Sequence, residues 1–112
     1  MAKISVVYVP IMDLIPSEYN PRRISRESMD QLKQSINRFQ MVDPIIANSA
    51  TNRKNIVIGG HVRLNAAKEL GFKEIPVVYI NIPDINKERE LNLRLNKNTG
   101  EWDYKLLNDF NE

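Results

Sequence analysis

The stretch IGGHVRLNAAKELG, residues 58–71, joins an apolar run to a helical pattern through two adjacent glycines. Leu64, Ala67 and Leu70 recur at helical spacing, which predicts a helix over residues 61–70. Glycine allows a tight turn and a close approach of a ligand to the backbone. The N–H groups of a first helical turn lack partners within the helix and attract anions, as does the helix dipole. The stretch therefore predicts a strand-to-helix turn, which is either a plain turn or a phosphate site.

Four short runs outside this helix are rich in β-branched and aromatic residues, the composition of β-strands. The second and third runs are separated by the polar segment SATNRK, and we expect them to pair through a loop. Pro16 and Pro21 predict an irregular loop after the first run. The four runs cover residues 4–11, 43–48, 55–59 and 73–82.

Apolar residues at helical spacing predict three further helices, each preceded by a residue suited to cap it. Ser25 precedes the first, Asp84 the second and Asp103 the last, while Gly71 is placed to end the helix described above. The alternation of strands and helices predicts an α/β or mixed α+β fold, with a small mixed sheet, flanking helices and the first of these helices on the sheet. The three helices cover residues 26–39, 85–97 and 104–110.

Length and composition limit the classes of protein to which the chain can belong. Its 112 residues, 42% hydrophobic and 27% charged, are typical of a soluble chain with one core. The absence of cysteine excludes disulfides, thiolate metal sites and cysteine nucleophiles, and the single histidine, His61, argues against a histidine-rich metal site. No apolar stretch approaches the roughly 20 residues that span a bilayer. We therefore expect no metal site, no membrane partner and a cytoplasmic location.

The basic side chains are concentrated in the middle of the chain. Residues 22–63 carry eight basic and three acidic side chains, although the net charge of the whole chain is only +2. Such an asymmetry points to an anionic partner, and a solvated basic helix face is the alternative. Arg53 and Lys54 belong to this region, and we expect them to lie at the tip of a solvated hairpin loop, with contact to DNA as the alternative.

The order of these segments resembles the N-terminal domain of the ParB/sulfiredoxin superfamily over most of residues 6–82. The resemblance is carried by YNPRR, the amphipathic helix, QMVDPIIAN, IVIGGHVRLNAAKELG and IPVVYIN. The tail LNLRLNKNTGEWDYKLL resembles ParB-like domains that precede DNA methyltransferase domains in phage and mobile-element proteins. The resemblance implies a core domain over residues 1–83. Residues 84–112 would be a helical extension leading to a further domain and offering a surface for it or for a homodimer.

Partition proteins of this superfamily carry the box Gly-Glu-Arg-Arg-x-Arg-Ala, which holds the triphosphate of CTP. Gly60 matches the glycine of that box and Arg63 keeps its second arginine, whereas His61 stands at the glutamate. Val62 and Asn65 replace the other two arginines. Because two phosphate-binding side chains are replaced, we expect a single phosphate at this turn and no turnover of CTP.

Sulfiredoxins carry Gly-Gly-Cys-His-Arg at the same place. Gly59, Gly60 and Arg63 match that motif, but His61 stands where the reactive cysteine is. Covalent chemistry of the sulfiredoxin kind needs that thiol, so we exclude it.

The loop motif NPRR is the second part of the resemblance that implies a site. The superfamily places this segment near the box, so Asn20, Arg22 and Arg23 are candidate contacts to phosphate or to a base edge. A proline-fixed turn with solvated arginines is the alternative. Glu18 is the only acidic residue near this loop, and it is the candidate general base if the chain is an enzyme.

The function most consistent with these observations is a ParB-like DNA-associated module that belongs to a larger DNA-modifying or partition protein. It would bind a phosphate of DNA or of a nucleotide, with Mg²⁺ accompanying a nucleotide. A nucleotide-dependent phosphotransferase, nucleotidase or nuclease is one alternative, and a protein–protein interaction module is the other. The candidate phosphate contacts are Gly59, Gly60, His61, Arg63, Asn20, Arg22 and Arg23.

The position of His61 in the first helical turn predicts its titration. The positive field of a helix N-terminus disfavours the imidazolium, so the pKa of His61 should lie below the usual histidine value without ligand. A bound phosphate should raise that pKa, and the binding of phosphate should therefore become stronger as the pH falls.

Overall fold

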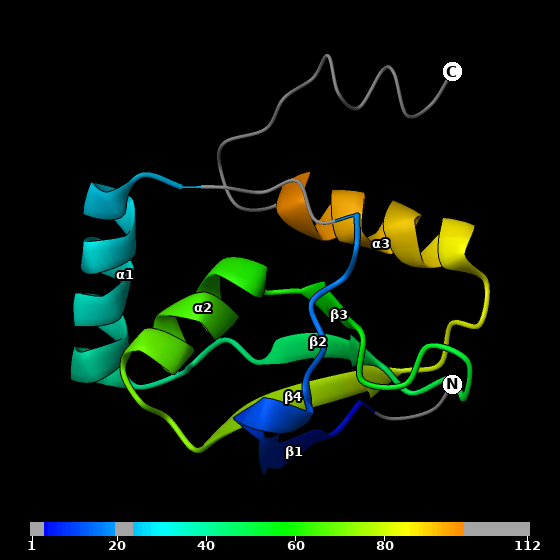
Figure 1. The fold of residues 1–112 in the computed structure, drawn as a ribbon, viewed down its shortest axis with the longest axis horizontal. Helices are drawn as coiled ribbons and strands as arrows, with labels where there is room; N and C mark the ends of the chain where they lie inside the picture. Colours follow the sequence, from blue (N-terminus) through cyan, green and yellow to red (C-terminus); the bar gives the residue numbers. More distant parts are fainter. Residues whose placement is uncertain (1–3, 20–23, 98–112) are drawn as a thin grey trace.

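The computed structural model describes residues 4–19 and 24–97 of the chain. Strands and short helices alternate along it (Figure 1), which confirms the predicted mixed α/β class. The predicted helix 104–110, with its cap Asp103, lies outside the described residues. The elements are β1 (Val6–Pro10), the 3-10 turn η1 (Ile11–Asp13), α1 (Arg26–Phe39), β2 (Ile45–Asn48), β3 (Val57–Gly59), α2 (His61–Glu69), β4 (Glu74–Ile80) and α3 (Ile85–Lys97).

The four strands form one mixed sheet in the order β1-β4-β2-β3. β1 is antiparallel to β4, with Val6 opposite Val78, and β1 lies at the edge of the sheet. β4 is parallel to β2, and β2 is antiparallel to β3, with an irregularity in register between Ile46 and Ala47. The strand pair predicted on either side of SATNRK is therefore confirmed. The crossover from β2 to β4 contains β3 and α2, and it includes the glycine turn.

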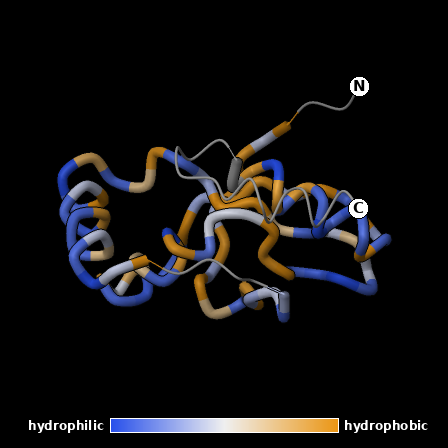
Figure 2. Tube along the Cα trace, turned by 90° about the horizontal axis from the view of Figure 1, so that it is seen from above, coloured by the Kyte–Doolittle hydropathy of each residue, from blue (hydrophilic) through white to orange (hydrophobic). Residues whose placement is uncertain are grey.

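The core lies between the sheet and α2. Leu64 and Ala67 of α2 are fully buried, as predicted from their spacing, and they pack with apolar residues of β2, β3 and β4. Figure 2 shows the hydrophobic segments gathered at the centre of the molecule, whereas α1 is largely hydrophilic. The buried cluster consists of Ile11, Leu14, Ile45, Ala47, Val57, Leu64, Ala67, Ile75 and Val77.

The helix α1 packs against α2 and not on the sheet (Figure 1), so the expected placement of helix 26–39 was wrong. Only Ile36 of its apolar stripe is buried, and Phe39 is 58% exposed. The bounds of the helix, Arg26–Phe39, are as predicted. Its cap is also as predicted, since the backbone N–H of Ser28 donates to Oγ of Ser25 at 3.1 Å. Spacing alone predicted an apolar face but not which element would cover it.

The helix α3 lies along β3 (Figure 1) and contacts that strand. Asp84 caps it as predicted, since the backbone N–H of Asn86 donates to Oδ1 of Asp84 at 2.9 Å. Gly71 ends α2 with a φ of +83°, also as predicted. Among the described residues, no helix is both long enough and apolar enough to cross a membrane.

Candidate functional site

The turn between β3 and α2 has little room for a side chain at either of its two glycines. Gly60 is the N-cap of α2 and has a left-handed conformation, with a φ of +93°. A Cβ at Gly60 would lie 2.8 Å from Cδ1 of Ile45, and a Cβ at Gly59 would lie 2.7 Å from Cδ1 of Leu95. The carbonyl of Gly60 accepts the first helical hydrogen bond, from Leu64, at 2.8 Å. The predicted strand-to-helix turn is therefore confirmed, and it is tightly packed on both sides.

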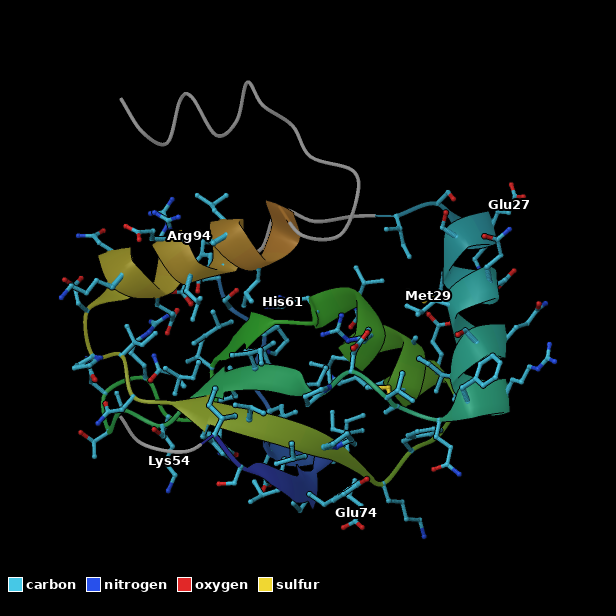
Figure 3. All side chains as sticks on the ribbon, turned by 180° about the vertical axis from the view of Figure 1, so that it is seen from behind. Glu27, Met29, Lys54, His61, Glu74 and Arg94 are labelled. Carbon is cyan, nitrogen blue, oxygen red and sulfur yellow. The ribbon has the colours of Figure 1, made fainter. Side chains whose placement is uncertain are left out.

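His61 is the first residue of α2, and its side chain is buried (Figure 3), with 5% exposure. The backbone N–H of Ser17 donates to Nε2 of the ring at 3.3 Å, and Oγ of Ser17 lies 3.0 Å from the same nitrogen. Burial lowers the pKa of His61 to about 4, against a smaller upward effect from the charge of Glu88. The direction agrees with the expectation, but burial, not the helix field, is the main cause. A neutral ring that accepts at Nε2 follows from these contacts.

Arg63 joins the first turn of α2 to the start of β2. Its Nη2 donates to the carbonyl of Pro44 at 3.2 Å. The same nitrogen lies 3.0 Å from the position of a Cβ on Gly60, so the guanidinium packs on the bare backbone of the turn. A positive charge is thereby held beside the N-terminus of α2, where a phosphate is also favoured.

Three consecutive residues at the start of the loop, 17–19, form hydrogen bonds to other parts of the protein. Ser17 contacts His61 as described, and Oε1 of Glu18 accepts from Nη1 of Arg53 at 3.1 Å. The hydroxyl of Tyr19 donates to Oε2 of Glu88 at 2.6 Å. The continuation of the loop, with the candidate contacts Asn20, Arg22 and Arg23, lies outside the described residues.

The candidate base Glu18 is used in an ion pair with Arg53. A backbone hydrogen bond and the contact with Arg53 lower the pKa of Glu18, which makes this candidate base weaker. Across residues 4–19 and 24–97, no group of three or more His, Asp or Glu side chains is placed to hold a metal ion. Glu18 therefore has the properties of an ion-pair partner.

Glu88 of α3 is fully buried, with 0% exposure, and the sequence did not mark it as a site residue. Its Oε1 accepts from Nδ2 of Asn48 at 2.7 Å and from Nε of Arg53 at 3.2 Å. Its Oε2 accepts from Tyr19 and, at 2.8 Å, from Nη2 of Arg53. Burial alone raises the pKa of Glu88, but the hydrogen bonds from Arg53, Tyr19 and Asn48 outweigh it and hold the pKa below its usual range.

Arg53 is consequently not a solvated residue at a hairpin tip, as the sequence had suggested. Its side chain is 15% exposed and forms ion pairs with both Glu88 and Glu18. A signal for these buried groups was present in α3, where the polar residues Glu88 and Asn92 are four positions apart and share one helix face. The pattern became informative only once their partners were known.

Comparison with known proteins finds relatives in bacteria. The ParB-like nuclease domain-containing protein YnaK of Escherichia coli is 33% identical over 88 residues, 78% of this chain and 97% of that protein. The probable chromosome-partitioning protein ParB of Campylobacter jejuni is 41% identical over 86 residues, 76% of this chain and 30% of that protein. A nucleoid occlusion protein of Geobacillus kaustophilus is 30% identical over 80 residues, 70% of this chain and 28% of the relative. The chain thus spans nearly all of the first relative and less than a third of the other two.

Solved structures share the fold. ParB from Caulobacter crescentus complexed with CTP-γ-S has a TM-score of 0.72 and 22% identity, covering 94% of this chain and 58% of that chain. The same protein complexed to the centromeric parS site has a TM-score of 0.70 and 21% identity, over 95% and 59% of the two chains. Sulfiredoxin from Arabidopsis thaliana has a TM-score of 0.61 and 18% identity, over 70% and 86%. At these identities the likeness confirms the fold alone.

The family assignment rests on the sequence match. The model of the ParB N-terminal domain matches residues 1–99, which contain all the described elements. The resemblance found from the order of NPRR, the amphipathic helix and the glycine turn is confirmed by that match. Together with the identity to YnaK over nearly its whole length, it shows that this chain belongs to the ParB N-terminal domain family.

Proposed function

We propose that the chain is a ParB-type, DNA-associated module that binds a phosphate, of DNA or of a nucleotide, at the turn between β3 and α2. The observation that carries the proposal is the left-handed Gly60 at the start of α2, with the guanidinium of Arg63 packed beside it. The first N–H groups of a helix and its dipole favour an anion at such a turn. One anionic charge gains about 0.3–1 kcal/mol there when exposed, and up to about 2 kcal/mol when partly buried.

The side chains have different roles in this proposal. Arg63 contributes the charge, and Gly59 and Gly60 allow the backbone to approach the ligand. Asn20, Arg22 and Arg23 are proposed as further phosphate contacts from the adjoining loop. His61 holds Ser17 through a neutral ring and adds no positive charge near neutral pH, since burial keeps its pKa near 4.

The ligand is proposed from two structural neighbours, which are ParB complexes with CTP-γ-S and with parS. The turn in this chain offers one arginine, whereas the partition box described above has three. This donor set fits a single phosphate, such as one of the DNA backbone, better than a triphosphate with its Mg²⁺. DNA is therefore the first ligand to test and a nucleotide the second.

The proposed setting is a larger partition or DNA-modifying protein in the cytoplasm. It is supported by the partitioning and nucleoid occlusion relatives, of which the chain spans less than a third. Residues 1–83 would act as the core of the module and residues 84–112 as an extension, and a neighbouring domain or second copy would meet that extension.

The test compares Arg63→Ala with Arg38→Ala, which removes the same charge from an exposed position at the end of α1. Duplex DNA binding is measured over a range of salt concentrations. We expect Arg63→Ala to weaken binding and to reduce the log–log salt slope by about 1, whereas Arg38→Ala leaves binding within twofold. Equal effects of the two variants would mean that the turn between β3 and α2 does not bind phosphate. Release of phosphate from a nucleotide with Mg²⁺ would instead support the enzyme alternative.

A further inference from the structure

The helix α3 presents two buried polar side chains to the sheet, one turn apart. Glu88 has 0% exposure and Asn92 has 2%. Apolar residues at these positions would bury the same face without a desolvation cost, so stability alone does not explain a carboxylate and an amide there. Asn92 contacts the strand that leads into the turn before α2, and Glu88 contacts residues outside that strand.

Asn92 contacts the end of β3. Its Nδ2 donates to the carbonyl of Ile58 at 2.7 Å, and Ile58 is the residue immediately before Gly59. Leu95, less than a turn further along α3, lies against Gly59 so closely that a Cβ there would be 2.7 Å from its Cδ1. The strand end is therefore held against α3 by one hydrogen bond and one apolar contact.

Glu88 contacts the loop segment 17–19, and the first residue of that segment contacts the start of α2. Tyr19 donates to it directly, at 2.6 Å, and Arg53 links it to Glu18 through bonds of 2.8 Å and 3.1 Å. The neighbouring Ser17 then donates to Nε2 of His61, the first residue of α2. The chain of contacts therefore runs from α3 through residues 17–19 to the start of α2.

We propose that Glu88 and Asn92 are positioning residues of the phosphate-binding turn, Asn92 by setting the end of β3 and Glu88 by setting residues 17–19 against His61. The inference rests on the proposed function. Neither side chain touches the ligand in it. Both act by fixing the geometry in which the N–H groups of α2 and the guanidinium of Arg63 meet a phosphate.

The decisive variant is Tyr19→Phe, which removes one hydroxyl and keeps the ring that lies 5.6 Å from the guanidinium carbon of Arg89. Tyr79→Phe is the matched control, because its hydroxyl also makes a 2.7 Å bond, to Oδ1 of Asn55. The positions of the Ser17 amide and of Nε2 of His61 are followed by NMR, and the affinity for duplex DNA and for inorganic phosphate is measured. Asn92→Ala tests the second contact in the same way.

We expect Tyr19→Phe to shift both NMR signals and to weaken binding of both probes about tenfold, while Tyr79→Phe leaves both within twofold. We expect Asn92→Ala to weaken binding to a similar extent but to shift the amides of Gly59 and Gly60 instead. Unchanged signals and affinities in Tyr19→Phe and Asn92→Ala, with binding lost in Arg63→Ala, would overturn the positioning role and leave the proposed function standing. If the unaltered chain binds neither duplex DNA nor inorganic phosphate, both the positioning role and the proposed function are overturned. That outcome is observed without any variant.

Discussion

The backbone N–H of Ser17 donates to Nε2 of His61 across 44 positions of sequence, at 3.3 Å. A backbone N–H can only donate, so this nitrogen must keep its lone pair, and an imidazolium could not take its place. The contact fixes the start of the loop against the first turn of α2. The one histidine of the chain therefore has a structural partner within the candidate site, and its charge state is linked to that partner.

Acid should destabilise the fold through His61 before the carboxylates titrate. The pKa of His61 is about 4 in the folded protein and about 6.5 when unfolded, so the unfolded state binds more protons as the pH falls from 7. The stabilisation is present above about pH 6.5 and is lost toward pH 4. The free energy of unfolding should fall by about 2 kcal/mol between pH 7 and pH 5. Urea titrations at the two pH values measure it.

The control for this pH dependence is His61→Gln, which does not titrate in the same window. Its free energy of unfolding should change by less than half as much between pH 7 and pH 5. If the variant shows the same loss as the unaltered chain, the titrating group is not His61. Glu88 does not interfere, since its lowered pKa places its titration at more acidic pH.

Replacing Gly60 should cost more stability than replacing Gly71. Both glycines have a positive φ, of +93° and +83°, but only at Gly60 would a Cβ meet another atom closely, 2.8 Å from Cδ1 of Ile45. Gly60→Ala therefore combines backbone strain with overpacking, each of about 1–3 kcal/mol, and Gly71→Ala has the strain alone. Chemical denaturation of the two variants isolates the steric effect. Equal losses would show that Ile45 moves aside.

The buried and exposed carboxylates of α3 should differ strongly in their effect on stability. Glu88→Ala leaves Arg53 largely buried without its main partner, and we expect a loss of about 3–5 kcal/mol. Glu90→Ala breaks an exposed pair with Arg94, of 3.2 Å, and should cost about 1 kcal/mol or less. Thermal or urea unfolding compares the two. A small effect of Glu88→Ala would mean that water or another group takes over its bonds to Arg53.

Restoring the two arginines of the partition box should give this chain tighter binding of CTP. The chain as it stands should not turn over CTP, because Val62 and Asn65 occupy two positions at which the partition box has arginine. The double variant Val62→Arg, Asn65→Arg should bind CTP-γ-S at least tenfold more tightly, since two charge-assisted contacts are added. Calorimetry measures the affinity, and a phosphate-release assay follows turnover. Turnover by the unaltered chain would contradict the prediction.

Local signals in the sequence were sufficient for most of the fold. The cap Ser25, the cap Asp84 and the glycine turn each act on their own neighbours, so their effects can be deduced without the rest of the chain. The core residues Leu64 and Ala67 follow from helical spacing in the same way. The family resemblance supplied the prediction that NPRR lies near the glycine turn, and NPRR lies outside the described residues.

The remaining features depend on contacts between residues far apart in the sequence. Glu88 and Arg53 are both charged residues in polar segments, and nothing in their own neighbourhoods shows that they are buried together. The packing of α1 on α2 is another tertiary choice, because an apolar stripe fits a helix as well as a sheet. The sequence predicted correctly that His61 lies in the first turn of α2, but not its contact with Ser17, which is 44 positions away.

The pairing of β1 with β4 has a consequence for the order in which the protein folds. Within the part of the chain that the structure describes, the first strand is opposite the last one, Val6 against Val78, and β4 lies between β1 and β2. On the ribosome, β1 emerges long before its partner exists, and β2 also lacks its neighbour on one side until Ile80 has been made. The sheet can therefore be completed only after β4 has been synthesised, and such long-range pairing is slow compared with helix formation.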